Sequence, residues 1–251
     1  MALNSNSTLK IAVCILHYGD PSLTERLHRQ LLNAEPEQAK HIYVLDNAAP
    51  QPCLNAWKRL PANVYWTGGL EYAWPEFARL GYTHIWFLNN DVLFHSPPPY
   101  LARAAGRLAR LQQTLGRVGI YAPAVRANPY HSQMVSRGPC ECRLVSYVDG
   151  IAPLIDLSCL RELGGLDAAD NPLGYGVDIW LSVRAKKAGW LLAVDNQVVL
   201  RHTYHSTAKQ TQGFLEQAAL DQHNFLSSRL GPDYQNFIQE QQKACQEIFS
   251  L

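Results

Sequence analysis

The sequence contains no run of about 18 apolar residues, the length that a membrane-spanning helix needs. Its beginning, MALNSNSTLK, lacks the basic start and the apolar stretch of a signal peptide. With 22 basic and 21 acidic residues the formal net charge is +1, so the broad positive field that nonspecific nucleic-acid binding requires is missing. We therefore expect a soluble, cytoplasmic protein that has no transmembrane segment and binds no nucleic acid.

Several motifs that define enzyme classes are also missing. There is no G-x-x-x-x-G-K-[ST] loop, and Gly68-Gly69 is not a dinucleotide fingerprint, which disfavours a kinase or a dehydrogenase. No G-x-S-x-G elbow is present, which weighs against an α/β-hydrolase. The six cysteines are scattered, and the close pair Cys140 and Cys142 has one residue between its members instead of the two or more usual in zinc sites. We expect reduced structural thiols and no disulfide framework.

What the sequence does have is an alternation of strand and helix patterns. Apolar runs rich in β-forming residues predict strands from residues 10, 41 and 84, and the short segment NVYW predicts another at 63–66. Apolar residues at helical spacing predict helices from residue 21, around 54–60, from 69 and over 100–115. This alternation predicts a parallel, doubly wound sheet covered by helices on both faces.

The pattern loosens after residue 115. GIYAPAV, RLVSYVDGIAPLIDL and LLAVDNQVVL predict shorter strands, so we expect the second half of the sheet to be mixed. Residues 213–251 predict two helices broken at GPDY. No linker separates the two halves, and we assign residues 1–212 to one domain. We treat residues 213–251 as a helical extension packed on that domain, where two copies of the chain could also associate.

Polar residues stand where several predicted strands end. Asp46 and Asp91 follow apolar strands, His202 follows a later one, and Asp178 opens a helical pattern. Each acid also has a structural explanation, as a turn residue at 46 or as a cap at 91 and 178. Because the carboxyl ends of parallel strands meet at one crevice, we expect these side chains to gather there. Mg²⁺ and Mn²⁺ bind carboxylates and complete their shells with substrate phosphates, and Mn²⁺ also accepts imidazole.

The sequence resembles family 2 glycosyltransferases with the GT-A fold, especially their rhamnosyltransferase-like branch, over about residues 10 to 207. Seven segments carry this resemblance by their order and spacing: IAVCILHYGD, IYVLDNAAP, NVYWTGGLEYAW, IWFLNNDVLF, VDGIAPLIDLSCLRELGGLD, GYGVDIWLSVRAKKAGW and VVLRHTYHS. The resemblance implies an α/β, GT-A fold with a Rossmann-like, mostly parallel central sheet, helices on both faces and a C-terminal helical tail. It also implies bacterial polysaccharide or glycolipid synthesis in the cytoplasm, where attachment to the inner face of the membrane stays open.

The same resemblance implies a site for a nucleoside diphosphate sugar. Asn89-Asn90-Asp91 matches the family's DxD motif in its NxD form, Asp46 matches the residue that contacts the base, and Gly68-Gly69 matches a Gly-Gly that lets the backbone approach the donor. The residues implied for the donor are His17, Tyr18, Asp46, Gly68, Gly69, Asn90 and Asp91. Asp91 and His202 are the implied ligands of Mn²⁺ or Mg²⁺, and His205 is close enough to compete with His202.

For the acceptor, Asp178 matches the second acid of the family's ED motif, which implies the base that activates the acceptor hydroxyl. The glutamate that precedes this base in the family is Val177 here, and Trp180 stands where a further acid is usual. The acceptor site therefore departs from the family pattern. We expect Trp180 to offer a stacking surface to a sugar, with Asp149 and His205 as further acceptor contacts. Other aromatic residues that could form this surface are Tyr72, Trp74 and Tyr175.

These expectations describe an inverting, metal-dependent glycosyltransferase that moves a sugar from a nucleoside diphosphate sugar to a hydroxyl of a glycan or lipid-linked acceptor. The alternative is a catalytically degenerate relative that binds a nucleotide sugar or a glycan as part of an assembly, with Val177 as the sign of lost activity. A nucleotidyltransferase is disfavoured because HYGDPSL, after the first strand, is not the glycine- and arginine-rich loop of such enzymes.

Overall fold

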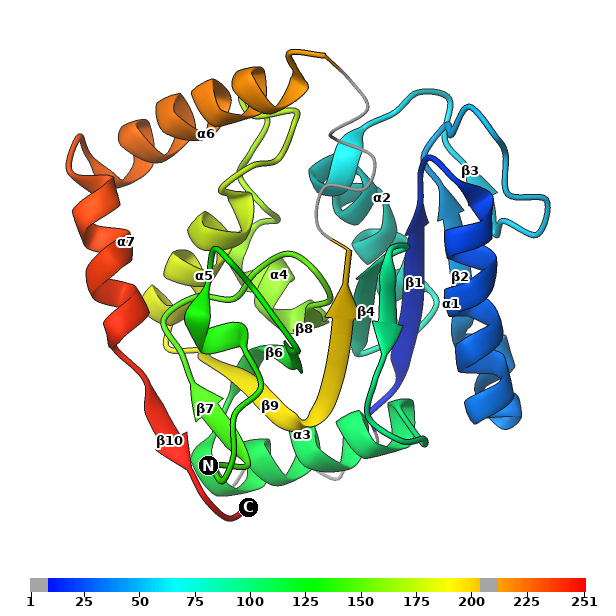
Figure 1. The fold of residues 1–251 in the computed structure, drawn as a ribbon, viewed down its shortest axis with the longest axis horizontal. Helices are drawn as coiled ribbons and strands as arrows, with labels where there is room; N and C mark the ends of the chain where they lie inside the picture. The colour runs from blue at the N-terminus through cyan, green and yellow to red at the C-terminus, as the bar shows by residue number, and fades with distance from the viewer. Residues whose placement is uncertain (1–8, 204–211) are drawn as a thin grey trace.

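The protein is built around a mixed β-sheet (Figure 1), and this computed structural model describes residues 9–203 and 212–251. The strands are β1 (Ile11–His17), β2 (Ile42–Asp46), β3 (Lys58–Arg59), β4 (His84–Asn89), β5 (Val92–Phe94), β6 (Val118–Val125), β7 (Cys142–Leu144), β8 (Leu154–Asp156), β9 (Leu191–His202) and β10 (Gln246–Ile248). Their order across the sheet is β10-β7-β9-β6-β8-β4-β1-β2-β3, and β5 pairs with β9.

Helices pack on both faces of this sheet. The helices of the described residues are α1 (Pro21–Ala34), α2 (Tyr65–Arg79), α3 (Leu101–Leu115), α4 (Leu157–Leu163), α5 (Val177–Lys187), α6 (Phe214–Leu230) and α7 (Tyr234–Lys243), with 3-10 segments η1 (Pro36–His41) and η2 (Ser132–Met134). Successive residues of a strand point to opposite faces of the sheet, so Leu16 and His17 of β1 contact the helices on different faces. Leu16 lies against Gly69 of α2, whereas His17 Nδ1 is 2.7 Å from Thr24 Oγ1 of α1.

The first half of the sheet is parallel, as the sequence predicts. β1 pairs in parallel with β2 and β4, and β2 pairs in parallel with β3. All seven residues of β1 are buried, which fits a strand covered on both faces. In the second half β8 is antiparallel to β4 and β6, β7 is antiparallel to β9, and β6 and β9 are parallel. The predicted mostly parallel sheet therefore describes the first half, and the whole sheet is mixed.

The segment NVYW, predicted as a strand, is instead the entry to α2. Val64 is the N-cap residue and the helix begins at Tyr65. Two carboxamides hold this entry: Asn47 Oδ1 accepts a hydrogen bond from Val64 N, and Asn63 Oδ1 accepts one from Tyr65 N. These bonds satisfy backbone donors that a helix start leaves open, and they outweigh the β-propensity of the aromatic residues.

The helix predicted around residues 54–60 is also absent from the structure. A turn and the short strand β3 occupy this part of the chain, and Leu54 is exposed. The loop is folded around the carboxylate of Asp46, which accepts hydrogen bonds from Ala49 N and Cys53 N. The buried carboxylate therefore decides the local structure here, because it supplies acceptors to backbone groups of a non-helical loop.

The C-terminal segment forms the two predicted helices, α6 and α7, and one unpredicted strand. β10 pairs antiparallel with β7 at the edge of the sheet. Phe225 and Leu226 of α6 are buried, and Leu226 packs against Gly176, just before α5. Among the described residues, no helix has the length and hydropathy to cross a membrane.

Candidate active site

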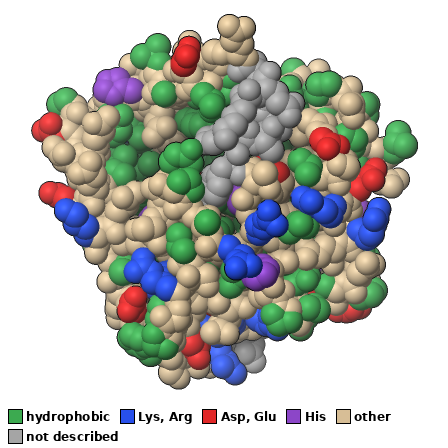
Figure 2. Space-filling model, viewed as in Figure 1, with side chains coloured by type: hydrophobic (Ala, Val, Ile, Leu, Met, Phe, Trp, Pro, Cys, Tyr) green, Lys and Arg blue, Asp and Glu red, His purple; other side chains and the backbone are tan. Residues whose placement is uncertain are grey.

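A cavity of about 850 Å³ opens at the carboxyl ends of β1 and β4. Its walls come from these strand ends, the first turn of α2, residues 147–151, the segment 173–179 and one side of α6 and α7. Figure 2 shows hydrophobic side chains around a hollow on the face below α6. The lining includes these residues singled out from the sequence: Tyr18, Asn90, Asp91, Asp149, Tyr175, Asp178 and His202.

The polar end of β4 is fixed to its neighbours. The buried apolar part of the strand ends at Asn89. Asn90 Nδ2 then donates hydrogen bonds to Tyr18 O and to Thr24 Oγ1, both at 3.1 Å. These two bonds tie the end of β4 to the end of β1 and to α1. They fix the backbone just before Asp91, so that its carboxylate has a defined position.

Asp91 and His202 lie together because of strand pairing. β5 and β9 are antiparallel, with Val92 opposite His202. His202 Nε2 is 3.1 Å from Asp91 Oδ1, and these side chains are 9% and 11% exposed. A carboxylate and an imidazole form a donor set that suits Mn²⁺. Across residues 9–203 and 212–251, no three His, Cys, Asp or Glu side chains are grouped to hold a metal ion. A cation held by this pair would accept water and substrate phosphates as further ligands.

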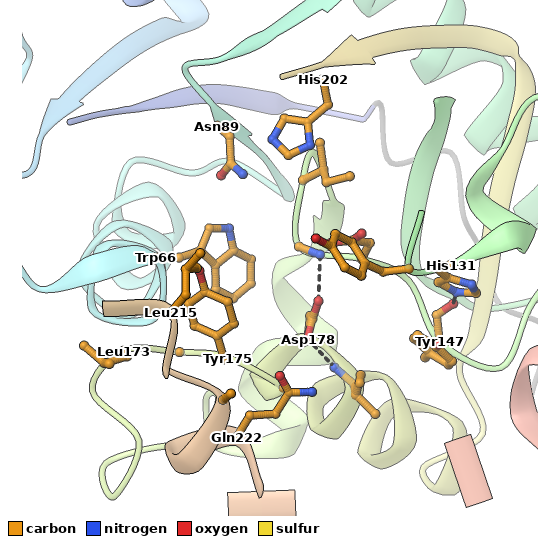
Figure 3. A pocket seen from close by; sticks show the side chains of 18 of the residues that line it. Trp66, Asn89, His131, Tyr147, Leu173, Tyr175, Asp178, His202, Leu215 and Gln222 are labelled. Atoms are coloured by element: carbon orange, nitrogen blue, oxygen red, sulfur yellow. Dashed lines mark hydrogen bonds between the residues drawn. The ribbon is translucent and has the colours of Figure 1, made fainter. Parts of the chain in front are cut away.

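Asp178 lies on another wall of the cavity, in the first turn of α5. The N-cap residue is Gly176, so Asp178 does not have the capping role that its sequence position also allowed. Asp178 Oδ2 accepts a hydrogen bond from Gly150 N at 2.9 Å, one of the dashed lines in Figure 3. Burial raises the pKa of Asp178 to about 7, and the negative charge of Asp149 adds to this increase. A carboxylate with this pKa can accept a proton near neutral pH.

Asp149 is a second carboxylate in the same cavity. Its Oδ2 accepts a hydrogen bond from Asn128 Nδ2 at 2.9 Å. Asn128 Oδ1 in turn accepts hydrogen bonds from Tyr130 N and His131 N, both at 2.9 Å. The hydrogen-bonded turn at Asn128 thus fixes the carboxylate of Asp149, whose negative charge is close enough to raise the pKa of Asp178.

Two residues predicted to contact the donor, His17 and Asp46, lie outside the cavity lining and are fully buried. The ring nitrogens of His17 are within hydrogen-bond distance of Thr24 Oγ1 and Gln51 O. Asp46 Oδ2 is 2.6 Å from Arg59 Nη1, and its carboxylate also holds the following loop. Both side chains therefore stabilise the fold, and their contact with the base of the donor stays a prediction.

Gly68 and Gly69 also lie outside the cavity lining, within α2. A Cβ atom on Gly69 would lie 2.8 Å from Leu16 Cδ1, and one on Gly68 would lie 2.5 Å from Val64 Cβ. The absent side chains allow α2 to pack on β1 and to form its first turns. The two glycines therefore have a packing role, and the approach of their backbone to the donor stays a prediction.

Of the predicted acceptor contacts, Asp149 lines the cavity and Trp180 does not. Trp180 Nε1 donates a hydrogen bond to Asp167 Oδ2 at 3.0 Å. Residues two apart on a helix face different directions, so α5 turns Trp180 away while it presents Asp178. His205, the other candidate, lies outside the described residues.

Sequence reasoning missed several residues that line the cavity. Trp66 was hidden in a segment predicted as a strand, and Asn89 was treated only as part of its motif. Gln222 and Gln242 reach the cavity from α6 and α7, which no local pattern connects to it. Tyr175, in contrast, is among the aromatic residues that the sequence offered for the acceptor surface, and it lines the cavity.

Comparisons with known proteins agree with this architecture. No protein-family model matches the sequence. The uncharacterized proteins Rv1525 of Mycobacterium tuberculosis and Mb1552 of Mycobacterium bovis are each 27% identical to it over 190 residues, covering 73% of this chain and 71% of theirs. Among solved structures, the chain is similar to the crystal structure of GalNAc-T7 with UDP, GalNAc and Mn²⁺, with a TM-score of 0.62 and 13% identity.

The match to GalNAc-T7 covers 79% of this chain and 44% of that one, so the chain spans less than half the length of the solved structure. At this level of identity the likeness defines the fold. The protein has a GT-A fold, an α/β architecture with a mixed, partly parallel central sheet.

Proposed function

We propose that the protein is an inverting, metal-dependent glycosyltransferase that moves a sugar from a nucleoside diphosphate sugar to a hydroxyl of a glycan or lipid-linked acceptor. One observation carries the proposal: a single cavity in a GT-A fold holds the Asp91–His202 pair and the carboxylate of Asp178. The similarity to GalNAc-T7, whose crystal structure contains UDP, GalNAc and Mn²⁺, supports the donor class and the choice of metal.

Asp178 acts as the general base in this mechanism. Its carboxylate accepts the proton of the acceptor hydroxyl as that oxygen attacks the anomeric carbon of the donor sugar. The bond from the anomeric carbon to the phosphate oxygen breaks in line with the attack, and the nucleoside diphosphate leaves with the bonding electrons. The pKa of about 7 suits this role, because a base works best when its pKa is near the working pH.

The Asp91–His202 pair holds the diphosphate end of the donor. A divalent cation bound by this pair would supply a Lewis acid that stabilises the charge on the leaving diphosphate. Asn90 fixes the backbone before Asp91 through its bonds to Tyr18 and Thr24, and α6 and α7 contribute further walls of the cavity. These groups orient the donor so that its anomeric carbon faces Asp178.

A thermal-shift screen against UDP, dTDP, GDP and CMP and their sugars, with and without Mn²⁺, tests the donor class. A ligand that binds only the folded protein stabilises it by about 2.7 kcal/mol at a hundred times its dissociation constant. We expect a shift with one nucleotide, larger with Mn²⁺ and lost in Asp91→Ala. No shift with any nucleotide would contradict the proposal.

The alternative of a catalytically degenerate protein that binds a nucleotide sugar or a glycan in an assembly predicts a different result. Val177, which stands where the family has glutamate, is buried in the core and offers no group for chemistry. If this alternative holds, nucleotides bind, but neither the natural protein nor Asp178→Asn releases a nucleoside diphosphate. Release of a nucleoside diphosphate that depends on Asp178 would exclude it.

A further inference from the structure

Two aromatic side chains that the mechanism above does not use, Trp66 and Tyr175, line the cavity on the same side of Asp178 (Figure 3). They come from the first turn of α2 and from the loop before α5. We propose that Trp66 and Tyr175 form a subsite that binds the ring of an acceptor sugar beside Asp178. This inference rests on the proposed function, because it places the sugar whose hydroxyl Asp178 deprotonates.

The loop that carries Tyr175 is wedged between two helices. Gly174 and Gly176 have positive φ angles of 83° and 82°. A Cβ atom on Gly174 would lie 2.3 Å from Thr67 Oγ1 of α2, and one on Gly176 would lie 3.0 Å from Leu226 Cδ1 of α6. Glycine is therefore required at both positions, by conformation and by space. The tyrosine between them is held at a fixed place in the cavity wall.

A buried asparagine fixes the same loop from inside. Asn171 Nδ2 donates a hydrogen bond to Tyr175 O at 2.8 Å, and Asn171 Oδ1 accepts one from Gly174 N at 3.2 Å. The Tyr175 ring also contacts Phe214 of α6 edge to face, with centroids 6.2 Å apart. The position of Tyr175 is thus preorganised, which lowers the entropy lost when a ligand binds.

Trp66 is placed by a strained backbone. Tyr65, just before it, has a φ angle of 56°, which is uncommon for a non-glycine residue. The carboxamides of Asn47 and Asn63 hold this conformation through Val64 N and Tyr65 N. Strain of this kind is often found where a site needs a particular geometry. Here the conformation directs the indole of Trp66 into the cavity wall.

The indole of Trp66 lies beside Gly150, the residue whose backbone N–H donates a hydrogen bond to Asp178. A Cβ atom on Gly150 would lie 3.3 Å from Trp66 Cε2 and 3.6 Å from Asp178 Cβ, and Gly150 N is the donor to Asp178. Trp66 Nε1 itself is buried and has no hydrogen-bond partner among residues 9–203 and 212–251, so the indole contributes its apolar ring to this wall.

The chemistry of these walls fits a sugar ring. Trp and Tyr combine a large apolar face with a polar group at one edge, which matches a pyranose with C–H bonds on its faces and hydroxyls around its rim. The neighbouring lining is apolar, with Leu173 before the loop and Leu215 on α6. The base of the nucleotide also has flat faces and could stack on the same side chains. An experiment that observes the sugar and the nucleotide together therefore distinguishes these two occupants.

Saturation-transfer NMR with methyl glycosides tests the subsite. The probes are the methyl glycosides of rhamnose, glucose, galactose and mannose, each with the full-length protein, UDP and Mn²⁺. Saturation of protein aromatic protons should reach the ring C–H protons of at least one glycoside. Tyr175→Leu and Trp66→Leu should each lower its affinity about tenfold, which corresponds to about 1.4 kcal/mol. Trp180→Leu, a matched control outside the cavity, should leave the affinity unchanged.

Tyr175→Phe keeps the aromatic ring and controls for folding, so this variant should retain the saturation transfer to the glycoside. Three results would overturn the inference: no transfer to any glycoside, equal affinity in the leucine variants, or transfer to the uracil protons of UDP that these variants abolish. Thermal shifts with nucleotides in the same samples separate this inference from the proposed function. Nucleotide binding without glycoside binding would contradict the acceptor subsite alone. Glycoside binding without any thermal shift from nucleotides would contradict the proposed donor class and would still support a sugar site.

Discussion

Replacing Asp178 by asparagine should stabilise the protein at alkaline pH while it removes activity. The pKa of Asp178 is raised from an ordinary value of 3.8 to about 7 in the folded protein. A carboxyl group with a raised folded-state pKa binds its proton more tightly in the folded state than in the unfolded state. The ionised form is therefore disfavoured by folding, so stability is greatest below about pH 4 and falls as the pH rises to about 7.

The size of this effect follows from the pKa difference of about 3 units, at 1.36 kcal/mol for each unit. Asparagine has no charge to bury, so its gain in the free energy of unfolding should reach about 4 kcal/mol at about pH 8 and about 2 kcal/mol at about pH 5. Urea denaturation of both proteins at the two pH values measures it. Asp233→Asn is the control, because that side chain is exposed and makes no capping hydrogen bond, so the substitution should give almost no change. A loss of stability in Asp178→Asn at alkaline pH, or an equal change at both pH values, would refute this reasoning.

Three further substitutions have distinct expected outcomes. Asp149→Asn should lower the pKa of Asp178 by removing a nearby negative charge, so the acidic limb of the pH profile of kcat/KM should move to lower pH; an unmoved limb would contradict this. His202→Ala should weaken Mn²⁺-dependent nucleotide binding at least about tenfold in calorimetric titrations, since even groups outside the first coordination shell contribute that much; equal binding would remove His202 from the metal site. Asp46→Ala should lower the free energy of unfolding in urea by about 3 kcal/mol, because Arg59 and two backbone donors lose their acceptor. A normal stability with selective loss of nucleotide binding would instead return Asp46 to the donor site.

The parts of the fold and site that could be predicted are those set by local pattern. Apolar strands that end in polar residues predicted β1, β2 and β4, and the convergence of strand ends brought Asp91 and His202 into one cavity with Asp178. The rule that strand ends converge did not show which of these acids line the cavity. Asp46 ends β2 as Asp91 follows β4, yet Asp46 bonds to Arg59, whose position depends on the path of the intervening loop.

The entry to α2 shows a second limit of sequence reasoning. Tyr65 and Trp66 have strand propensity, but the helix start there depends partly on Asn47, which lies 17 residues before Val64. Bonds of this range are invisible to a periodicity that compares near neighbours. Trp66 was missed as a cavity residue for the same reason, whereas Tyr175 was among the aromatic residues offered for the acceptor surface.

The most direct test of the central claim is the release of nucleoside diphosphate from UDP-, dTDP- and GDP-sugars by the purified protein with Mn²⁺. Our account predicts release from at least one of them. The rate should fall about 10²- to 10⁴-fold in Asp178→Asn, while nucleotide binding is retained. Release at the same rate in Asp178→Asn, or no release from any sugar nucleotide that binds, would contradict the assignment of this cavity as a glycosyltransferase active site.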